Sequence, residues 1–554
     1  MIYYPTKQIE IINPDKEWYK NTIYKLINIT KFVSSKYPRS KVKRKLQKEY
    51  AYAIMEMLNC NNDNDIKSYY EDIIDMIISI ENEKEFVIAL CHAIREIGID
   101  YIHIIGDIFD RGPRPDLIIE ELMKYEHVDI QWGNHDISWM GAASGNKSLI
   151  ANVIRIALSY NSFDLLEDGY GINLRPLSDF VREIYKDDPC DSFVPHILDE
   201  NQYDIVDKEL TAKMHKAITI IQLKLDGQLI EKHPEYHMNH LQWLKNTDFT
   251  RYIVYYDNKD YKLNDTFFPT IDVSNPLKLT KEESLMNTLQ SSFLRSERLQ
   301  KHIQYIYAHG NMYKIFNGNL LFHGCIPLNV DGTFRSVKVH DKVVSGKELL
   351  DELEKVINNA YFHHEYVDDM WFLWCSPDSP VFGKSKLSVF EKYFIDDKSI
   401  SKEEYDYYYQ FIENEEVALY ILRNFGLDNK KSHIINGHVP VKIKDGEKPI
   451  KANGKVYVID GGISKAYQSK TGNAGYTLIY DSYSLKLARH RPYDREAIFG
   501  LLCLTPEVKV IESHDRLKNK DCDMGIELYE RINDLQALLK EFQNGKIKEK
   551  YIHK

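Results

Sequence analysis

The spacing of hydrophobic positions changes several times along the chain, and each change predicts a different kind of element. In the N-terminal part, apolar residues recur three or four positions apart at 17–37 and 68–80, which predicts amphipathic helices. Short continuous apolar runs at 99–105 and 128–132 are instead typical of strands covered on both faces. Pro115 begins a helix between these two runs. Strand, helix and strand in this order predict a right-handed βαβ unit.

After this unit, helical patterns alternate with strand patterns. Two apolar runs around Asn317-Gly318 predict a hairpin, because this dipeptide favours a two-residue turn. The patterns divide the chain into seven segments: a helical region at 1–98, the βαβ unit at 99–145, a helical insertion at 146–311, a core hairpin at 312–339, a second insertion at 340–430, core strands at 431–500 and a C-terminal helical segment at 501–554. Alternating strands and helices of this kind predict an α/β protein.

Composition narrows the class of protein. The 554 residues are too many for one simple core, and 43% apolar and 28% charged residues are typical of a globular protein. The net charge of −11 argues against nucleic acid or a membrane surface as the main partner. Seven dispersed cysteines without a CxxC pair indicate reduced thiols, and no apolar run is long enough to span a bilayer. The first residues lack the pattern of a signal peptide, so we expect a cytoplasmic protein.

Two short loops carry most of the chemistry. GDIFDRG follows the first predicted strand of the βαβ unit, and GNHD follows the second. Because sites in parallel sheets lie beyond the carboxyl ends of the strands, we expect the polar residues of both loops to gather at one end of the sheet. These residues are Asp107, Asp110, Arg111, Asn134 and His135.

Four side chains that follow strand-like segments are candidate metal ligands: Asp107, Asn134, His323 and His438. Their carboxylate, amide and imidazole groups suit Mn²⁺, Fe²⁺ or Zn²⁺ better than Ca²⁺ or a structural zinc. Each has a glycine beside it, which allows a sharp turn and leaves room for an anion. A single Gly-His pair is more often a buried, hydrogen-bonded histidine. The four residues together with the two loops predict a divalent metal site.

The neighbouring residues are candidates for catalysis. An Asp110–Arg111 pair in an ordinary loop would be a surface ion pair of little energetic value. In a ligand loop, the planar guanidinium of Arg111 can instead hold phosphate oxygens. Asp110 can bond His135, fix its tautomer and raise its pKa, so that His135 protonates a leaving alkoxide. A metal beside them would polarise a phosphoryl group. The predicted reaction is phosphomonoester hydrolysis.

Three other patterns have a structural interpretation as well as a functional one. The basic stretch 39–48 is interpreted as a solvated helix face, with a phosphate-facing patch or a subunit contact as the alternative. HHEYVDD (363–369) has the composition of a metal cluster, but adjacent histidines tend to point apart, which favours a surface or core role. Lys384 and Lys386 could contact a sugar phosphate or belong to a solvated loop, and the sequence favours neither.

Longer phrases carry a family resemblance. GDIFDRG and GNHD match two signatures of the calcineurin-like metallophosphoesterase superfamily. GDIFDRGPRPDLI, DIQWGNHDISWMGAASGN, LEDGYGINLRPL, INGHVPV and WFLWCSPDSPVFGKSKLSVFEKYFI closely resemble class III fructose-1,6-bisphosphatases of the Firmicute type, and the resemblance covers nearly the whole chain. It implies a four-layer αββα metallophosphoesterase core with large helical insertions. It also implies Mn²⁺-dependent removal of the 1-phosphate of fructose 1,6-bisphosphate in gluconeogenesis and, in many members, activation by phosphoenolpyruvate. It leaves a homo-oligomer open.

Carried over by motif, the resemblance makes Asp107 the carboxylate that bridges two metals, and Asn134, His323 and His438 the other ligands of the second metal. Asp110 and His135 become an acid dyad, and Arg111 a phosphate clamp. The family's N-terminal D-x-H signature is absent, because none of the 20 histidines has Asp two positions before it. The first metal would therefore keep only Asp107, and we expect the first core strand to be missing.

Three hypotheses follow from this departure. The favoured one is a fructose-1,6-bisphosphatase whose complete form has its first segment upstream of Met1. The second is an N-terminally truncated remnant with impaired or no catalysis, which binds sugar phosphates or partners. The third is another metallophosphatase, such as a phosphoprotein phosphatase; the phrases outside the metal loops argue against it, because they belong to the insertions that would shape the pocket.

Overall fold

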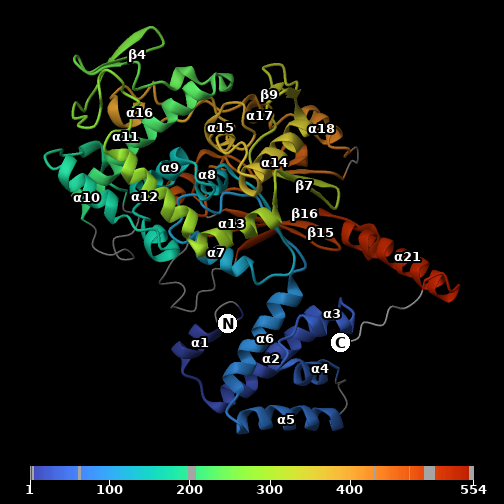
Figure 1. Ribbon diagram of the computed structural model, residues 1–554. Coiled ribbons are helices and arrows are strands. Elements are labelled where there is room, and N and C mark those ends of the chain that lie inside the picture. Colours follow the sequence, from blue (N-terminus) through green and yellow to red (C-terminus); the bar gives the residue numbers. More distant parts are fainter. Residues whose placement is uncertain are drawn as a thin grey trace. The chain divides into compact units, whose positions relative to one another are not determined.

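The computed structural model describes residues 2, 5–59, 64–196, 207–427, 431–472, 475–491 and 506–547. The chain forms two compact units (Figure 1). One consists of residues 1–103 and 123–128, and the other of residues 104–122 and 129–554. In the part of the chain that the structure describes, no helix combines the length and the apolar character that crossing a membrane would require.

The first unit is helical, as the periodicity predicts. Its helices are α1 (Pro5–Ile12), α2 (Lys16–Ser34), α3 (Arg39–Arg44), α4 (Ala51–Asn59), α5 (Asn64–Ser79) and α6 (Glu83–Gly98). The side chain of Asp15 caps α2 by accepting a hydrogen bond from the backbone N–H of Trp18. Fully buried side chains of α2 and α6, such as Ile27 and Leu90, form the core between these helices.

The basic stretch 39–48 lies in this first unit and has a structural role. Lys41 forms an ion pair with Asp100 at 2.7 Å. Lys45 donates hydrogen bonds to the backbone carbonyls of Glu96 and Ile99, where α6 ends. A cation at the negative end of a helix is favourable. The other basic residues of the stretch are exposed, so the segment is in part the solvated face that the sequence suggests.

The second unit contains the strands that position the candidate site. A five-stranded sheet has the order β12 (Ile450–Lys451), β13 (Val456–Val458), β11 (Ile434–Asn436), β8 (Asn319–Phe322) and β7 (Tyr313–Phe316). β8, β11 and β13 run parallel, and β7 and β12 are antiparallel edge strands. The predicted Asn317-Gly318 turn joins β7 to β8, with positive φ angles of 48° and 72° at its two residues.

A second sheet has the order β1 (Ile102–Ile104), β2 (Val128–Gln131) and β6 (Gly310–Asn311). β2 is fully buried and pairs in parallel with β6. The prediction that the first strand is covered on both faces is wrong, because β1 is only half-buried. Its position explains the difference: β1 is an edge of this sheet as described, and an edge strand has a neighbour on one side only. α7 (Pro115–Leu122) begins at Pro115, as predicted.

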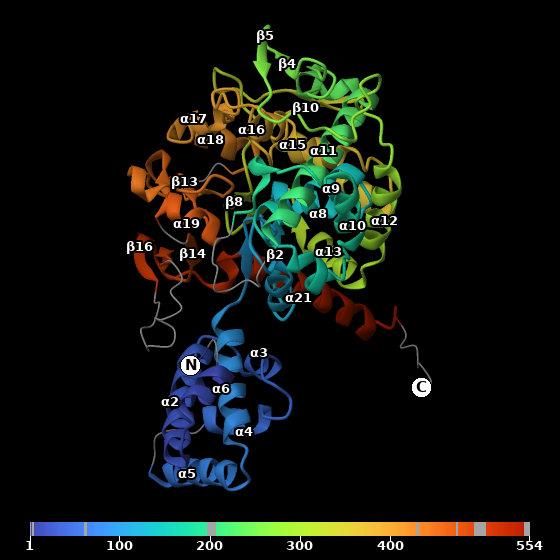
Figure 2. The ribbon, with the colours of Figure 1, turned by 90° about the vertical axis from the view of Figure 1, so that its left-hand side faces the viewer.

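The insertion at 146–311 supplies a layer of buried helices. α8 (Asn134–Ala143) packs on α9 (Lys147–Ser159), and α9 packs on α11 (Lys208–Lys232); Figures 1 and 2 show these helices side by side. α10 (Arg175–Ile184), α12 (Glu282–Arg295) and α13 (Glu297–His309) complete the group. The insertion is not wholly helical, because β3 (Thr247–Asp248), β4 (Ile253–Tyr256) and β5 (Lys259–Lys262) form a small antiparallel sheet. The signal was the Asp257–Asn258 turn, whose residues have φ angles of 49° and 56°.

The insertion at 340–430 is mainly helical. It contains α14 (Gly346–Phe362), α15 (Asp369–Cys375), α16 (Phe390–Phe394), α17 (Tyr407–Phe411) and α18 (Glu415–Asn424), and a short hairpin of β9 (Val337–Val339) and β10 (Lys342–Val344) lies at its start. α15 packs on α8 and on α14.

The C-terminal part follows α19 (Lys465–Thr471) and contains a sheet of β14 (Tyr476–Tyr480), β15 (Ser484–Arg489) and β16 (Glu507–Ser513). The segment predicted as helical, 501–554, therefore includes a strand. EVKVIES alternates apolar and polar residues, and pairing with β15 fixes it as β16. α21 (Asp523–Gln543) matches the predicted last helix, but its apolar side chains are exposed; Leu535 is 63% exposed.

Candidate metal centre

Glycine allows the two loops of the candidate site to approach each other closely. Gly106 has a φ of 89°, and a Cβ atom there would lie 2.4 Å from the carbonyl oxygen of Gln131. A Cβ atom on Gly133 would lie 2.1 Å from Oδ1 of Asp107. Both distances are too short for a side chain, so only glycine fits at these two positions. The two glycines let the loops lie close together, with Asp107 beside the start of α8. Asp107 has a φ of 58°, a strained value of the kind that clusters at functional sites.

Asp136, the last residue of GNHD, joins the two loops. Its carboxylate accepts hydrogen bonds from the backbone N–H groups of Asp107 (2.7 Å), Gly133 (3.0 Å) and Phe109 (3.3 Å). Burial, followed by the charge of Asp107, raises the pKa of Asp136 to about 7. No role for Asp136 was predicted from the sequence. The available signal was its position in the first turn of α8, where an acidic side chain can satisfy free backbone N–H groups.

Asp107, His323 and His438 present donor atoms to one point, although they are far apart in sequence. Nε2 of His323 lies 3.3 Å from Oδ2 of Asp107 and 3.2 Å from Nδ1 of His438. Nδ1 of His438 lies 4.0 Å from Oδ2 of Asp107. His323 follows β8 and His438 follows β11, and the parallel pairing of these strands brings the two histidines together. Asn134, the first residue of α8, lines a cavity together with Asp107 and His438. Its buried Oδ1 has no hydrogen-bond partner among the described residues.

The chemistry of this donor set fits a divalent cation. Two atoms that each lie about 2.1 Å from a cation are about 3.0 to 4.2 Å apart for bond angles from 90° to 180°, and the three separations above fall in that range. The Nδ1 atom of His323 lies 2.6 Å from the carbonyl oxygen of Ile105, which fixes the tautomer and leaves Nε2 for a metal. The unpartnered Oδ1 of Asn134 would be a fourth donor.

The charges of Asp107 and His323 support the same fit. Burial alone would disfavour both charges, but the carboxylate of Asp107 raises the pKa of His323 to about 9. His323 in turn holds the pKa of Asp107 below its ordinary range despite burial. Asp107 is therefore an anion that requires a positive partner in this site. A cation can take the place of the proton on His323, because metal binding and proton release are linked at such ligands.

The predicted dyad is present beside these ligands. Oδ1 of Asp110 lies 3.1 Å from Nε2 of His135 and 3.3 Å from Nε of Arg111. The charge of Asp110 raises the pKa of His135, as predicted, but burial, to which the Trp374 ring contributes, lowers it by more. The net pKa of His135 is therefore below its ordinary value, not above it as the prediction required. His135 is therefore a neutral imidazole at neutral pH while the cavity holds no anion.

Arg111 lies in the cavity between two aromatic rings. Its guanidinium carbon is 5.2 Å from the centroid of Tyr160 and 5.0 Å from that of Tyr467. Burial opposes the charge of Arg111, but Asp110 raises its pKa still further above the ordinary value. A rigid guanidinium of this kind is suited to bind phosphate oxygens.

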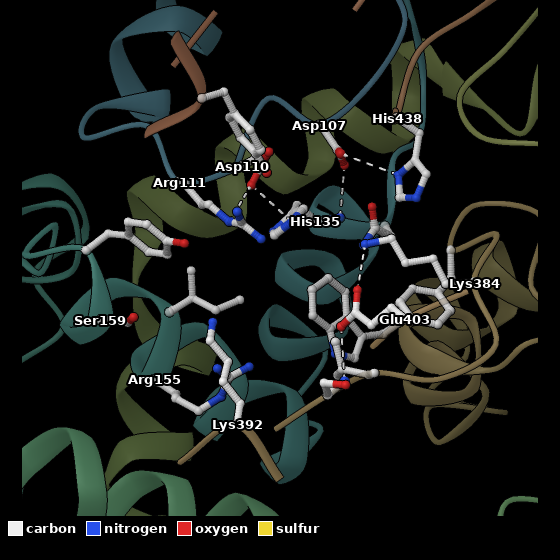
Figure 3. A pocket seen from close by; sticks show the side chains of 18 of the residues that line it. Asp107, Asp110, Arg111, His135, Arg155, Ser159, Lys384, Lys392, Glu403 and His438 are labelled. Carbon is white, nitrogen blue, oxygen red and sulfur yellow. Dashed lines mark hydrogen bonds and ion pairs between the residues drawn. The ribbon is translucent and has the colours of Figure 1, made fainter. Parts of the chain in front are cut away.

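One cavity of about 330 Å³, which is large enough for a small molecule, is lined by Asp107, Asp110, Arg111, Asn134, His135 and His438 (Figure 3). His323 lies behind this lining, in contact with Asp107 and His438. The cavity is also lined by side chains that were not predicted from the sequence: Arg155, Lys392, Glu403, Trp374 and Tyr467. Figure 3 shows Arg155 and Lys392 on the side away from Asp107 and His438. A signal existed for one of them, because Asn152 and Arg155 interrupt the otherwise apolar run ANVIRIALSY at a spacing of three. Lys392 and Glu403 come from the second insertion, and no local pattern separates them from other charged residues there.

The remaining predicted patterns have different outcomes. Lys384 lines the cavity and forms an ion pair with Glu403 at 2.9 Å, whereas Lys386 pairs with Glu391 at 3.1 Å outside it. In HHEYVDD, His363 and His364 are exposed, and Asp368 accepts from Lys232 and His233 at 2.6 and 3.0 Å. That segment shows no group of metal-binding side chains in the described part of the chain.

Comparison with known proteins decides the family. A family profile described as Firmicute fructose-1,6-bisphosphatase matches residues 1–544. This chain belongs to that family. A relative from Clostridium acetobutylicum, named fructose-1,6-bisphosphatase class 3, is 48% identical over 99% of this chain and 85% of its own length. A relative of the same name from Clostridium tetani is 49% identical with the same coverage, and one from Clostridium beijerinckii is 47% identical over 99% of this chain and 86% of its own.

The family assignment agrees with the resemblance drawn from the motifs, and it covers both the site loops and the insertions. No solved structure was found to match the chain.

Proposed function

We propose that this protein hydrolyses fructose 1,6-bisphosphate to fructose 6-phosphate and phosphate with the help of bound Mn²⁺. The observation that carries the proposal is the convergence of donor atoms from Asp107, His323 and His438 next to the Asp110–His135 pair. Asp107, His438, Asp110 and His135 line one cavity. The named activity of the relatives supports the substrate. The same relationship supports a four-layer αββα core, and a cytoplasmic role in gluconeogenesis, for this chain.

Asp107, Asn134, His323 and His438 would hold the cation. When bound, it would supply a Lewis acid that polarises the phosphoryl group. Arg111 binds the oxygens of the phosphate that is removed, and the flanking rings of Tyr160 and Tyr467 keep its guanidinium in place. Because the fork binds two oxygens at once, it orients the phosphorus for attack along the line of the bond that breaks.

His135 is the proposed proton donor to the leaving sugar oxygen. Asp110 holds Nε2 of His135 at 3.1 Å, which fixes the ring and leaves the other nitrogen for the leaving group. The imidazole is neutral in the free cavity because burial lowers its pKa. A phosphate dianion placed beside it favours the imidazolium form, so the protein takes up the required proton when substrate binds.

The experiment that tests the substrate compares phosphate release by the purified chain, with Mn²⁺ added, from fructose 1,6-bisphosphate and from a phosphopeptide. We expect the sugar bisphosphate to have the higher kcat/KM. Faster hydrolysis of the phosphopeptide would contradict the proposal and favour a phosphoprotein phosphatase. Activation by phosphoenolpyruvate and assembly into a homo-oligomer stay predictions, which rate measurements with the activator and light scattering would test.

A further inference from the structure

Two of the basic side chains that line the cavity have an acidic partner, and two do not. Arg111 has Asp110 as its acidic partner at 3.3 Å, and Lys384 has Glu403 at 2.9 Å. Arg155 and Lys392 line the same cavity, but neither has a carboxylate within 4.0 Å in the described part of the chain. The cavity therefore contains two cations that the described protein does not neutralise.

Arg155 is fixed in place by neutral groups. Its side chain projects from α9 and is 8% exposed. Nε donates to Oε1 of Gln222 at 2.7 Å, and Nη2 donates to Oδ1 of Asn152 at 2.8 Å; both partners are fully buried. These amides orient the guanidinium without cancelling its charge, and Nη1 has no partner among the described residues. A buried cation without an acid is costly, and a bound anion would remove that cost.

Lys392 reaches the cavity from a different element, α16, and its side chain is exposed there. Figure 3 shows Lys392 next to Arg155, on the side of the cavity away from Asp107 and His438. Surrounding protein lowers the pKa of the Lys392 ammonium, and the like charges of Arg155 and Arg111 lower it further. Two neighbouring cations repel each other unless an anion lies between them.

We propose that Arg155 and Lys392 bind the phosphate of the substrate that is not removed. The phosphate that is removed would lie at the opposite end of the cavity, next to Asp107 and His438, which we call the metal end. The inference rests on the proposed function, since it requires a substrate with two phosphates. A phosphate dianion offsets the two free positive charges, and the guanidinium of Arg155, held by Gln222 and Asn152, offers it a preorganised donor. The site would distinguish a sugar bisphosphate from a sugar with a single phosphate.

The first test is Lys392→Met, because Lys392 is exposed and its replacement leaves the packing intact. With fructose 1,6-bisphosphate we expect KM to rise about 10- to 100-fold and kcat to change little, since the lost contact is made equally before and during the reaction. With fructose 1-phosphate, which lacks the second phosphate, we expect no change in kcat/KM. The matched control is Lys398→Met, which removes the same charge from an exposed position in the same segment.

The second test measures binding without turnover. Titration calorimetry with fructose 6-phosphate is carried out on the unmodified chain, on Lys392→Met, on Lys398→Met and on Arg155→Lys. We expect the dissociation constant to rise about tenfold in Lys392→Met and in Arg155→Lys, because the latter keeps the charge but loses the planar fork. Lys398→Met should bind as the unmodified chain does.

The outcomes separate this inference from the proposed function. Equal KM values for the unmodified chain and Lys392→Met overturn the second phosphate site. An equal loss with fructose 1-phosphate also overturns it, because the cations would then serve the reacting phosphate. A chain that hydrolyses a general substrate such as p-nitrophenyl phosphate but not fructose 1,6-bisphosphate overturns the proposed function alone. In that case, fructose 6-phosphate binding that depends on Lys392 would still support the site.

Discussion

The two ends of the cavity differ in how the chain builds them. At the metal end, Asp107, His323 and His438 follow strands of two sheets, and strand pairing fixes their positions. At the opposite end, Arg155 lies on a buried helix of one insertion and Lys392 on a short helix of another. The first end holds charges that satisfy one another, whereas the second holds two cations that the described residues leave unpaired. The candidate metal ligands are thus held by strands, and the two unpaired cations by the insertions.

This difference separates the site residues that the sequence predicts from those that it does not. Loops after strands have a recognisable form, because glycine is needed where the backbone turns and approaches a ligand closely, as at Gly106 and Gly133.

The largest effect is expected for Asp107→Asn at the metal end. Among the described residues, Asp107 is the carboxylate within 4.0 Å of both His323 and His438, so its loss removes the charge that favours a cation there. We expect hydrolysis to fall about a thousandfold or more, together with Mn²⁺ binding. Calorimetry with Mn²⁺ checks the second point, and Asp534→Asn, at an exposed position of α21, is the control. Full activity in Asp107→Asn would show that this end is not the catalytic one.

His135→Ala separates catalysis from metal binding within the same end. We expect kcat to fall roughly 10²- to 10³-fold because the leaving group loses its proton donor. Mn²⁺ affinity should stay as it is, since Nε2 of His135 is occupied by Asp110. His364→Ala, at an exposed histidine, is the control. Loss of Mn²⁺ binding in His135→Ala would instead identify His135 as a ligand.

Asp136→Ala tests whether the hydrogen bonds of Asp136, which join the GDIFDRG and GNHD loops, are needed to form the candidate metal site. The change leaves the backbone N–H groups of Asp107, Gly133 and Phe109 without their acceptor. We expect the free energy of unfolding to fall by about 3 kcal/mol and Mn²⁺ affinity to fall roughly tenfold or more. Chemical denaturation and Mn²⁺ titration measure the two quantities. Unchanged Mn²⁺ affinity would mean that the loops hold their positions without Asp136.

The smallest effect concerns the support beneath the second end. Asp226 accepts hydrogen bonds from Ser148, from Trp371 at 2.8 Å and from Gln222 at 3.3 Å, and Gln222 in turn holds Arg155. Burial raises the pKa of Asp226 to about 6. The folded state therefore binds a proton that the unfolded state, with a pKa near 3.9, releases.

The stability that Asp226 contributes is consequently present at low pH and lost as the pH rises through about 6. Between pH 5 and pH 7, the free energy of unfolding of the unmodified chain should fall by roughly 1 kcal/mol relative to that of Asp226→Asn. Denaturation curves at several pH values check this difference. A difference that stays constant or increases with pH would contradict the protonation state assigned to Asp226.

The sequence predicts the fold best where local signals are strong. The Asn317-Gly318 turn, the helix that begins at Pro115 and the helices of the first unit follow from turn chemistry and periodicity. β16 and the partial exposure of β1 do not, because strand pairing and burial depend on neighbours that are distant in the sequence. For the same reason, the role of Lys392 cannot be predicted from the sequence, because it depends on which charges surround this residue after folding.

Asp107, Asn134, His323 and His438 are proposed to bind one cation. Anomalous diffraction from a crystal of the chain grown with Mn²⁺ would locate that cation. We expect a manganese peak bonded to Asp107, to Oδ1 of Asn134, to Nε2 of His323 and to Nδ1 of His438. A crystal without such a peak, or with manganese held by other side chains, would contradict this proposal.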